Sequence, residues 1–168
     1  MKTLILIRHA KSGWHESGST DFERSLNHRG LKDGPMMGRR LAARLDTGNL
    51  KLDGFFCSAA RRASQTATLL ANELAFPLAS INWRRELYLA SPATMVNVIQ
   101  SAPDKAATMA LLAHNPGITE LAEQLTKTYF GNVPTCGVIT LRLPIESWKD
   151  VGGRGELIDF DFPKRQSQ

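Results

Sequence analysis

Residues 4–7 and 108–113 form two unbroken, largely aliphatic runs. Short runs of this kind are typical of strands that are buried on both faces of a parallel sheet. A further strand is expected at residues 52–57, and a shorter one at residues 78–83, at the edge of the sheet. The hydrophobic pattern therefore predicts a sheet whose central strands are parallel.

The first helix is expected from about residue 28 to residue 45, where apolar residues recur at steps of three and four. Asn27 is its predicted N-cap, and Gly48 is its predicted C-terminal cap. Gly34-Pro35 predicts a kink or a restart, because proline inside a helix removes a backbone hydrogen bond.

Three later segments have the pattern of amphipathic helices. Ser58 is the expected N-cap of a helix that Pro77 ends. Ser91 is the expected cap of a helix over residues 92–101, and another helix runs from the segment 114–117 to about residue 125. Strands and helices thus alternate along the chain, which indicates an α/β fold.

The last two strands are expected at residues 138–143 and 156–162. A glycine-rich turn at residues 152–155 lies between them, so we expect them to pair antiparallel. The chain shows no internal repeat and no linker, and we expect one domain over residues 1–168.

Composition excludes several classes of protein. The chain of 168 residues is 42% hydrophobic, which is ordinary for a folded domain. No apolar run approaches the roughly 20 residues that span a bilayer. The apolar run at the N-terminus is too short for a signal peptide, so we expect a cytoplasmic protein. Cys57 and Cys136 lie too far apart to suggest a metal motif or a disulfide framework.

The net charge is +5, which suits an anionic substrate or partner. Aromatic residues make up only 7% of the chain, and no basic run is interleaved with them. Binding of single-stranded nucleic acid, which combines cations with stacking platforms, is therefore weakly supported.

Cations and histidines follow three of the predicted strands. Arg8-His9 follows the first, Arg62 lies just past the second, and His114 follows the run 108–113. If these strands are parallel, all three groups meet at the sheet edge where α/β proteins bind ligands. Two guanidinium groups and two imidazoles suit a tetrahedral, doubly charged oxyanion, because arginine binds phosphate bidentately.

The sequence contains no glycine-rich phosphate loop of the Walker type and no cluster of carboxylates that would hold magnesium. A nucleotide kinase or a metal-dependent phosphatase is therefore disfavoured, and we expect neither a metal nor another cofactor. Phosphoryl transfer without a metal needs a protein nucleophile. Histidine is the best candidate, because neutral imidazole attacks phosphorus at physiological pH.

The residues around these positions resemble the motifs of the histidine phosphatase superfamily, the phosphoglycerate-mutase-like proteins. Residues 6–12 resemble its Arg-His-Gly signature, residues 58–67 its second motif, and His114-Asn115-Pro116-Gly117 its second-histidine motif. Residues 21–30 and 87–91 further resemble the SixA-type phosphohistidine phosphatases. The resemblance spans residues 3–125 and implies a three-layer α/β sandwich with a mostly parallel central sheet and helices on both faces.

The resemblance also implies roles for individual residues. His9 would attack phosphorus, and water would then hydrolyse phospho-His9. Arg8, Arg62 and His114 would bind the phosphoryl oxygens, with Arg24 as a further contact. Ala10 replaces the usual glycine of the motif, which is tolerable only if its φ angle is negative.

The proton donor is open at this level. Superfamily members that act on phosphate esters use a carboxylate to protonate the leaving alkoxide, and Glu86 is the nearest match by order. Glu86 could equally pair with Arg84 or Arg85 at the surface. A phosphohistidine substrate loosens the requirement, because imidazole is a better leaving group than an alkoxide.

The leading hypothesis is therefore a phosphohistidine phosphatase that is independent of metals and acts on a phosphorylated protein partner. A broad-specificity phosphomonoesterase for small molecules is the alternative. A mutase is less favoured, because no insertion is available to enclose its substrate. A non-catalytic phosphate- or RNA-binding module would not need His9 and His114. We expect no nucleic-acid partner and no membrane partner.

Overall fold

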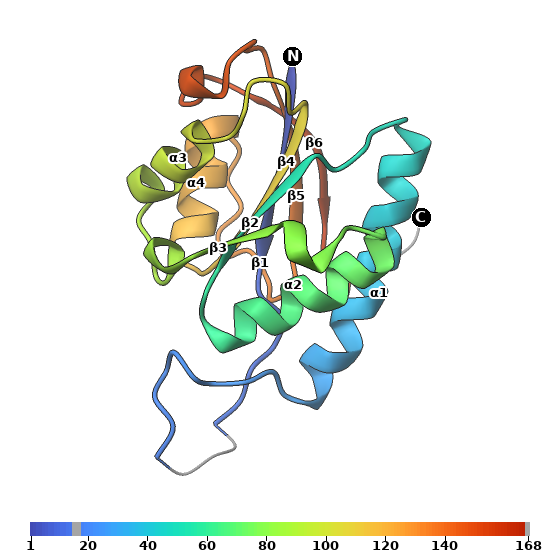
Figure 1. Cartoon of the computed structure of the whole chain (residues 1–168), viewed down its shortest axis with the longest axis vertical. Helices are drawn as coiled ribbons and strands as arrows, with labels where there is room; N and C mark the ends of the chain where they lie inside the picture. The colour runs from blue at the N-terminus through green and yellow to red at the C-terminus, as the bar shows by residue number, and fades with distance from the viewer. Residues whose placement is uncertain (15–17, 167–168) are drawn as a thin grey trace.

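The computed structural model describes residues 1–14 and 18–166. Within this part of the chain, six strands form one sheet in the order β3-β2-β4-β1-β5-β6 (Figure 1). The strands are β1 (Lys2–Arg8), β2 (Gly54–Ser58), β3 (Ile81–Arg84), β4 (Thr108–Ala113), β5 (Val138–Leu143) and β6 (Glu156–Asp161). Strands β3, β2, β4 and β1 are parallel, whereas β5 and β6 are antiparallel to their neighbours.

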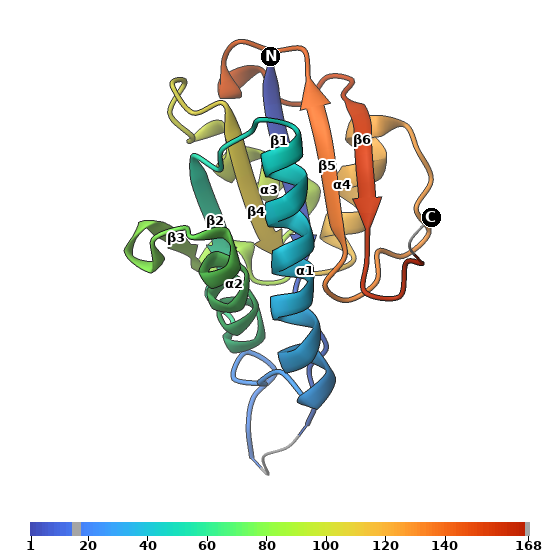
Figure 2. The same ribbon diagram turned by 90° about the vertical axis from the view of Figure 1, so that its right-hand side faces the viewer.

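Helices cover both faces of this sheet (Figure 2). They are α1 (His28–Thr47), α2 (Arg61–Leu74), α3 (Pro92–Gln100) and α4 (Gly117–Thr126). Helices α1 and α2 pack against each other on one face, and α3 and α4 lie on the other. The predicted α/β sandwich with a mostly parallel central sheet is therefore confirmed.

Strand β1 shows why its sequence is apolar throughout. Successive side chains of a strand point to opposite faces of the sheet. Leu4 and Leu6 accordingly join the core beneath α3 and α4, whereas Ile5 and Ile7 join the core beneath α1 and α2. All four side chains are fully buried, which explains the absence of alternation with polar residues.

The parallel strands bring the chemically active junctions to one edge. Arg8 of β1 is in register with Ala113 of β4, so His9 and His114 leave neighbouring strands at the same level. Strand β2 pairs with β4 on its other side and ends at Ser58. This edge lies at the lower end of the sheet in Figure 1, beside the first turn of α2.

Helix α1 is continuous from His28 to Thr47 with Pro35 inside it, so the predicted restart at Gly34-Pro35 is wrong, and the alternative, a kink, stays a prediction. Gly34 packs so closely on α2 that a Cβ atom would lie 2.7 Å from Cδ1 of Leu69. Tertiary packing against α2 thus holds the helix together where its own sequence weakens it. Asn27 is the N-cap as predicted, because its side chain accepts a hydrogen bond from the backbone of Gly30.

Two other local predictions need correction. Ser58 does not cap α2, because the residue that precedes the helix is Ala60, which makes no side-chain cap. Residues 78–83 are only partly extended: Leu78–Ser80 form a 3₁₀ turn, and strand β3 begins at Ile81. The strand does lie at the edge of the sheet, as expected.

None of the described helices combines sufficient length with sufficient hydrophobicity to cross a bilayer.

The start of α4 depends on a glycine that has no room for a side chain. A Cβ atom at Gly117 would lie 2.2 Å from the carbonyl oxygen of Ala90 and 2.7 Å from Cε of Met95. Gly117→Ala should therefore lower the free energy of unfolding by about 1–3 kcal/mol, as measured by urea denaturation. Gly153→Ala is the matched control, because nothing lies within 4 Å of its added Cβ atom. Equal losses in the two variants would contradict this close packing.

Candidate active site

A pocket of about 340 Å³ opens at the carboxyl edge of the parallel strands. It brings together five of the six predicted site residues, Arg8, His9, Arg24, Arg62 and His114. The remaining lining residues are Lys11, Ser12, Asp21, Leu89, Asn115 and Thr135. The cations therefore converge from β1, from the loop that precedes α1, and from the first turn of α2.

The hydrogen bonds of His9 fix its tautomer. The guanidinium Nε of Arg62 lies 3.3 Å from Nε2 of His9, and Nε2 must be the acceptor because guanidinium only donates. The Nδ1 atom of His9 lies 2.7 Å from the carbonyl oxygen of Ala10 and therefore carries the proton. The ring is neutral in this arrangement, and Nε2 carries a lone pair.

The ring of His114 is positioned by Ser58, the residue that the sequence predicts as the cap of α2. Its Nε2 atom lies 2.7 Å from Oγ of Ser58, while Oγ accepts a hydrogen bond from the backbone of Ala60. The Nδ1 atom of His114 is buried and has no partner among the described residues. The rings of His9 and His114 are 5.1 Å apart between centroids, so the two imidazoles face one small volume.

Burial keeps both histidines neutral at physiological pH. It lowers the pKa of His9 to about 3, and the nearby guanidinium groups of Arg62, Arg8 and Arg24 act in the same direction. Burial also lowers the pKa of His114 to about 3, assisted by His9 and Arg62. Desolvation disfavours the charged imidazolium, and adjacent cations add repulsion.

Arg62 and Arg8, the two predicted phosphate-binding arginines that lie outside the loop before α1, are held by different contacts. Arg62 is only 2% exposed, and its guanidinium group donates hydrogen bonds to His9 and Asp21. Arg8 donates from Nη1 to the carbonyl oxygen of Val133 at 2.9 Å, and its buried Nε has no partner in the described part of the chain. Arg61, by contrast, is exposed, so the helix presents only the second of its two arginines to the pocket.

Asp21 is the site residue whose role the sequence did not reveal. Its Oδ2 atom accepts hydrogen bonds from the hydroxyl of Tyr88 and from Nη2 of Arg62, the latter at 3.1 Å. Its Oδ1 atom lies 3.2 Å from Nη2 of Arg24. Although burial raises the pKa of Asp21, the Tyr88 hydroxyl and Arg62 outweigh that effect and lower it below its usual value. The spacing of Asp21 and Arg24, three residues apart within a polar loop, was the available signal.

Glu86 lies outside this group. It is exposed, does not line the pocket, and accepts a hydrogen bond from Nε of Arg84 at 2.6 Å. That hydrogen bond lowers the pKa of Glu86. Of the alternatives that the sequence left open for Glu86, the structure therefore has the surface pairing with Arg84.

The backbone conformation of Ala10 allows alanine in place of the usual glycine of the motif. It is not among the described residues with a positive φ angle, so a side chain is tolerated there. Its backbone N–H donates to Oγ1 of Thr66, and that hydroxyl in turn donates to the carbonyl oxygen of Arg62. One threonine thus ties the turn after β1 to the first turn of α2.

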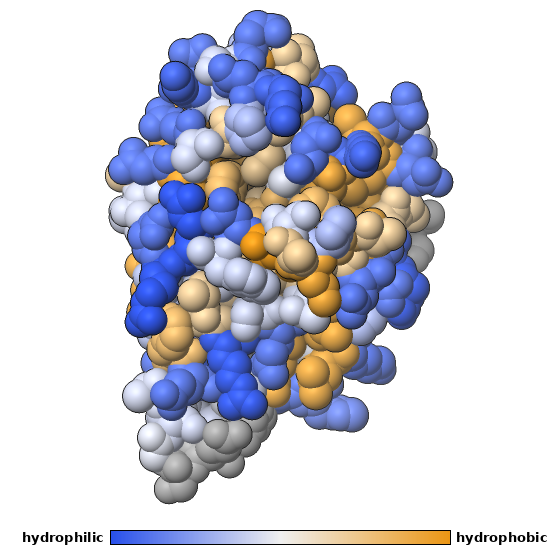
Figure 3. Space-filling view, in the orientation of Figure 1, coloured by the Kyte–Doolittle hydropathy of each residue, from blue (hydrophilic) through white to orange (hydrophobic). Residues whose placement is uncertain are grey.

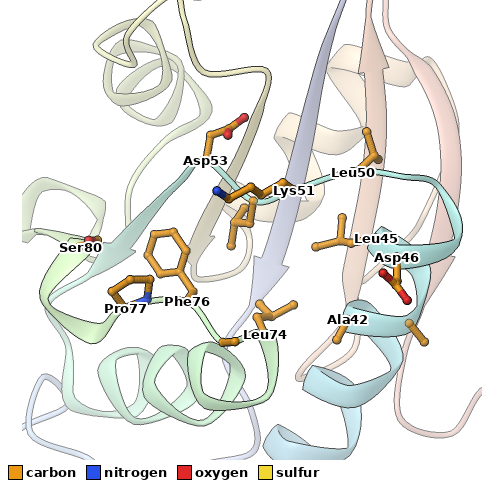
Figure 4. A pocket seen from close by; sticks show the side chains of 13 residues that line it. Ala42, Leu45, Asp46, Leu50, Lys51, Asp53, Leu74, Phe76, Pro77 and Ser80 are labelled. Atoms are coloured by element: carbon orange, nitrogen blue, oxygen red, sulfur yellow. The ribbon is translucent and has the colours of Figure 1, made fainter.

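No set of three or more histidine, cysteine or acidic residues in the described ranges could hold a metal ion. A larger pocket of about 670 Å³ lies between the C-terminal ends of α1 and α2 and the segment before β2 (Figure 4). Its walls combine apolar side chains such as Leu45 and Phe76 with Asp46 and Lys51, and it contains no histidine.

Figure 3 shows the distribution of hydrophobic and hydrophilic residues on one face of the molecule. Hydrophobic residues there lie mainly at the centre and on the right-hand side of the view, with hydrophilic residues around them.

Known proteins with similar structures include phosphohistidine phosphatases. A protein from Agrobacterium tumefaciens, assigned as the phosphohistidine phosphatase SixA, superposes with a TM-score of 0.80 at 25% identity, covering 96% of this chain and 98% of that chain. A structure of the protein histidine phosphatase SixA with tungstate gives a TM-score of 0.78 at 18% identity, covering 96% and 97%, and shares the fold.

Sequence comparisons lead to the same group. An uncharacterized protein of Mycobacterium tuberculosis is 28% identical over 173 residues, which cover 94% of this chain and all of that protein. The family model of the histidine phosphatase superfamily (branch 1) matches residues 4–125. Because this match covers most of the chain and includes the whole predicted constellation of cations and histidines, the chain belongs to the histidine phosphatase superfamily, branch 1, and is a phosphatase.

Proposed function

We propose that this phosphatase hydrolyses phosphohistidine on a protein partner through a covalent phosphohistidine intermediate on His9. The observation that carries the proposal is the state of His9: a neutral imidazole whose unprotonated Nε2 lies beside the guanidinium group of Arg62. A neutral imidazole is the nucleophilic form, and an adjacent cation stabilises the charge of a transferring phosphoryl group.

The proposed first step transfers the phosphoryl group to the enzyme. The lone pair on Nε2 of His9 forms a bond to phosphorus, and the bond from phosphorus to the substrate nitrogen breaks. The electron pair leaves with the substrate imidazole. Arg8, Arg62, Arg24 and His114 bind the phosphoryl oxygens, and their fixed positions stabilise the spread charge of the transition state.

The second step returns the enzyme to its starting state. The oxygen of a water molecule bonds to phosphorus, and the bond between phosphorus and Nε2 of His9 breaks. The electron pair returns to Nε2 of His9, the proton lost by the attacking water passes to solvent, and inorganic phosphate is released. Positive charge in the pocket comes from guanidinium groups, so we propose that turnover needs no divalent metal.

The leaving group supports phosphohistidine as the substrate. Among the described residues that line the pocket, Asp21 is the only carboxylic acid, and its lowered pKa keeps it ionised at neutral pH. An ionised carboxylate cannot protonate a leaving alkoxide, whereas an imidazole that already carries a proton leaves as a neutral ring. The pocket therefore favours a phosphorus–nitrogen bond over a phosphate ester.

The substrate preference can be measured directly. A protein domain that carries phosphohistidine should have a kcat/KM about 100-fold above that of simple phosphate esters, because general acid catalysis is typically worth at least this factor. The comparison should be run with and without EDTA, and turnover should survive chelation. Faster hydrolysis of the esters would establish the small-molecule phosphomonoesterase instead. Loss of activity in EDTA that magnesium restores would overturn the mechanism.

The covalent intermediate can be trapped. Rapid quenching during turnover of a ³²P-labelled substrate should leave a label on the protein that is labile in acid and stable in base. His9→Ala should abolish this label and reduce kcat by at least about 10³-fold, the scale on which nucleophiles contribute. His28→Ala, at an exposed histidine at the start of α1, is the control and should label normally. A label that persists in His9→Ala would rule out His9 as the nucleophile.

The neutral state of His9 has a direct consequence for its pH dependence. An ordinary histidine side chain becomes protonated as the pH falls through about 6.5. The pKa of His9 is lowered to about 3, so its ring should remain neutral between pH 8 and pH 5. NMR of the ring carbons and nitrogens, assigned with His9→Ala, measures this state. A titration with a midpoint between pH 6 and 7 would contradict the burial and tautomer described for His9.

A further inference from the structure

The guanidinium group of Arg62 donates three hydrogen bonds within the protein. Its Nε atom donates to Nε2 of His9, its Nη2 to Oδ2 of Asp21, and its Nη1 to the backbone oxygen of Asp21 at 2.6 Å. The Nε and Nη2 atoms form one edge of the planar guanidinium fork, the edge suited to bidentate recognition of carboxylate or phosphate. A phosphoryl group that used this edge would compete with the Asp21 carboxylate.

The Asp21 carboxylate is held in this place by groups that do not depend on the substrate. The hydroxyl of Tyr88 donates to Oδ2, and Nη2 of Arg24 pairs with Oδ1. The side chain of Asp21 is nevertheless 37% exposed, whereas that of Arg62 is 2% exposed. The carboxylate can therefore move toward solvent, whereas the arginine cannot.

Three residues that line the pocket have a buried side-chain nitrogen atom that Asp21 leaves without a partner. The Nε atoms of Arg8 and Arg24 and the Nδ1 atom of His114 are buried without a partner in the described part of the chain. All three residues line the same pocket. The two guanidinium Nε atoms are donors, and buried donors without partners are costly, so their presence around one small volume indicates a ligand with several acceptor oxygens. A tetrahedral phosphoryl group has more acceptor oxygens than a carboxylate.

We propose that the Asp21 carboxylate occupies the phosphoryl-oxygen position on Arg62 in the phosphate-free enzyme, and that the phosphoryl group of the substrate displaces it. This inference rests on the proposed role of Arg62 and Arg24 in binding the phosphoryl group. The exchange favours a doubly charged tetrahedral oxyanion, which gains the unsatisfied donors, over a carboxylate ligand, which only replaces one carboxylate by another. The return of Asp21 to Arg62 also assists the release of product phosphate.

The proposal predicts that removing the competing carboxylate tightens the binding of inorganic phosphate. Asp21→Asn keeps the shape of the side chain and removes its charge, so the Kd of phosphate, measured by calorimetry, should fall about tenfold. Glu73→Gln is the matched control, because it removes the same charge from an exposed ion pair with Arg39. Its Kd should stay within about twofold of the wild-type value.

Tyr88→Phe separates displacement from a simple change of electrostatic field. It leaves the charge of Asp21 in place but removes the hydroxyl that holds the carboxylate on Arg62. Displacement predicts tighter phosphate binding in Tyr88→Phe, by about threefold, the scale of one modest hydrogen bond. A field effect alone predicts no change. If Asp21 served only to position the arginines, both Asp21→Asn and Tyr88→Phe would bind phosphate more weakly, which would overturn the proposal.

A crystal structure of the wild-type enzyme with inorganic phosphate tests the exchange directly. The Asp21 carboxylate should have left Nη2 of Arg62, with a phosphate oxygen in its place. A bound phosphate together with an intact contact between Asp21 and Arg62 would overturn the inference, even if Asp21→Asn did not fold. Phosphate binding that Arg62→Ala leaves unchanged would instead contradict the proposed function of the site, which distinguishes the two failures.

Discussion

Arg62 is the residue on which the geometry of this site depends, because its charge is almost completely buried. A buried guanidinium group is costly unless it is paired and hydrogen-bonded. The fold supplies its partners from two separate places: His9 at the end of β1, and Asp21 in the loop that precedes α1. The position of His9 and the path of the long loop are thus tied to one helical residue.

The sheet makes this arrangement possible by being buried on both faces. Strands β1 and β4 are parallel neighbours, so the two histidines that follow them lie side by side, with ring centroids 5.1 Å apart. The two hydrophobic cores hold these strands from opposite sides and leave their carboxyl ends little freedom. A catalytic site on such rigid elements is positioned before the substrate arrives, which is the condition for electrostatic stabilisation of a transition state.

Burial and positive charge act together on the chemistry of the pocket. They lower the pKa of His9 and His114 to about 3, so the histidines are neutral where an exposed imidazole would be partly protonated. The same cations, with the Tyr88 hydroxyl, keep Asp21 ionised. The pocket therefore combines neutral imidazoles and guanidinium donors with a carboxylate that is a poor acid. This balance of protonation states is the main support for the proposed phosphohistidine substrate.

Much of the fold followed from local sequence, because aliphatic runs and helical periodicity depend on residues a few positions apart. The order of the elements, the antiparallel C-terminal pair and the Asn27 cap were predicted from such patterns and are confirmed. The positions of His9, Arg62 and His114 after their strands were equally visible, since parallel strands deliver their ends to one edge.

The contacts that complete the site were decided only by the tertiary structure. Ser58 has the pattern of a helix cap, yet its hydroxyl meets His114, 56 residues away. Asp21 reads as an ordinary loop residue, yet it pairs with Arg62, 41 residues away, whereas Glu86 pairs with its near neighbour Arg84. Pairing over such distances depends on how helices and loops pack against the sheet, and no local pattern of residues records that packing.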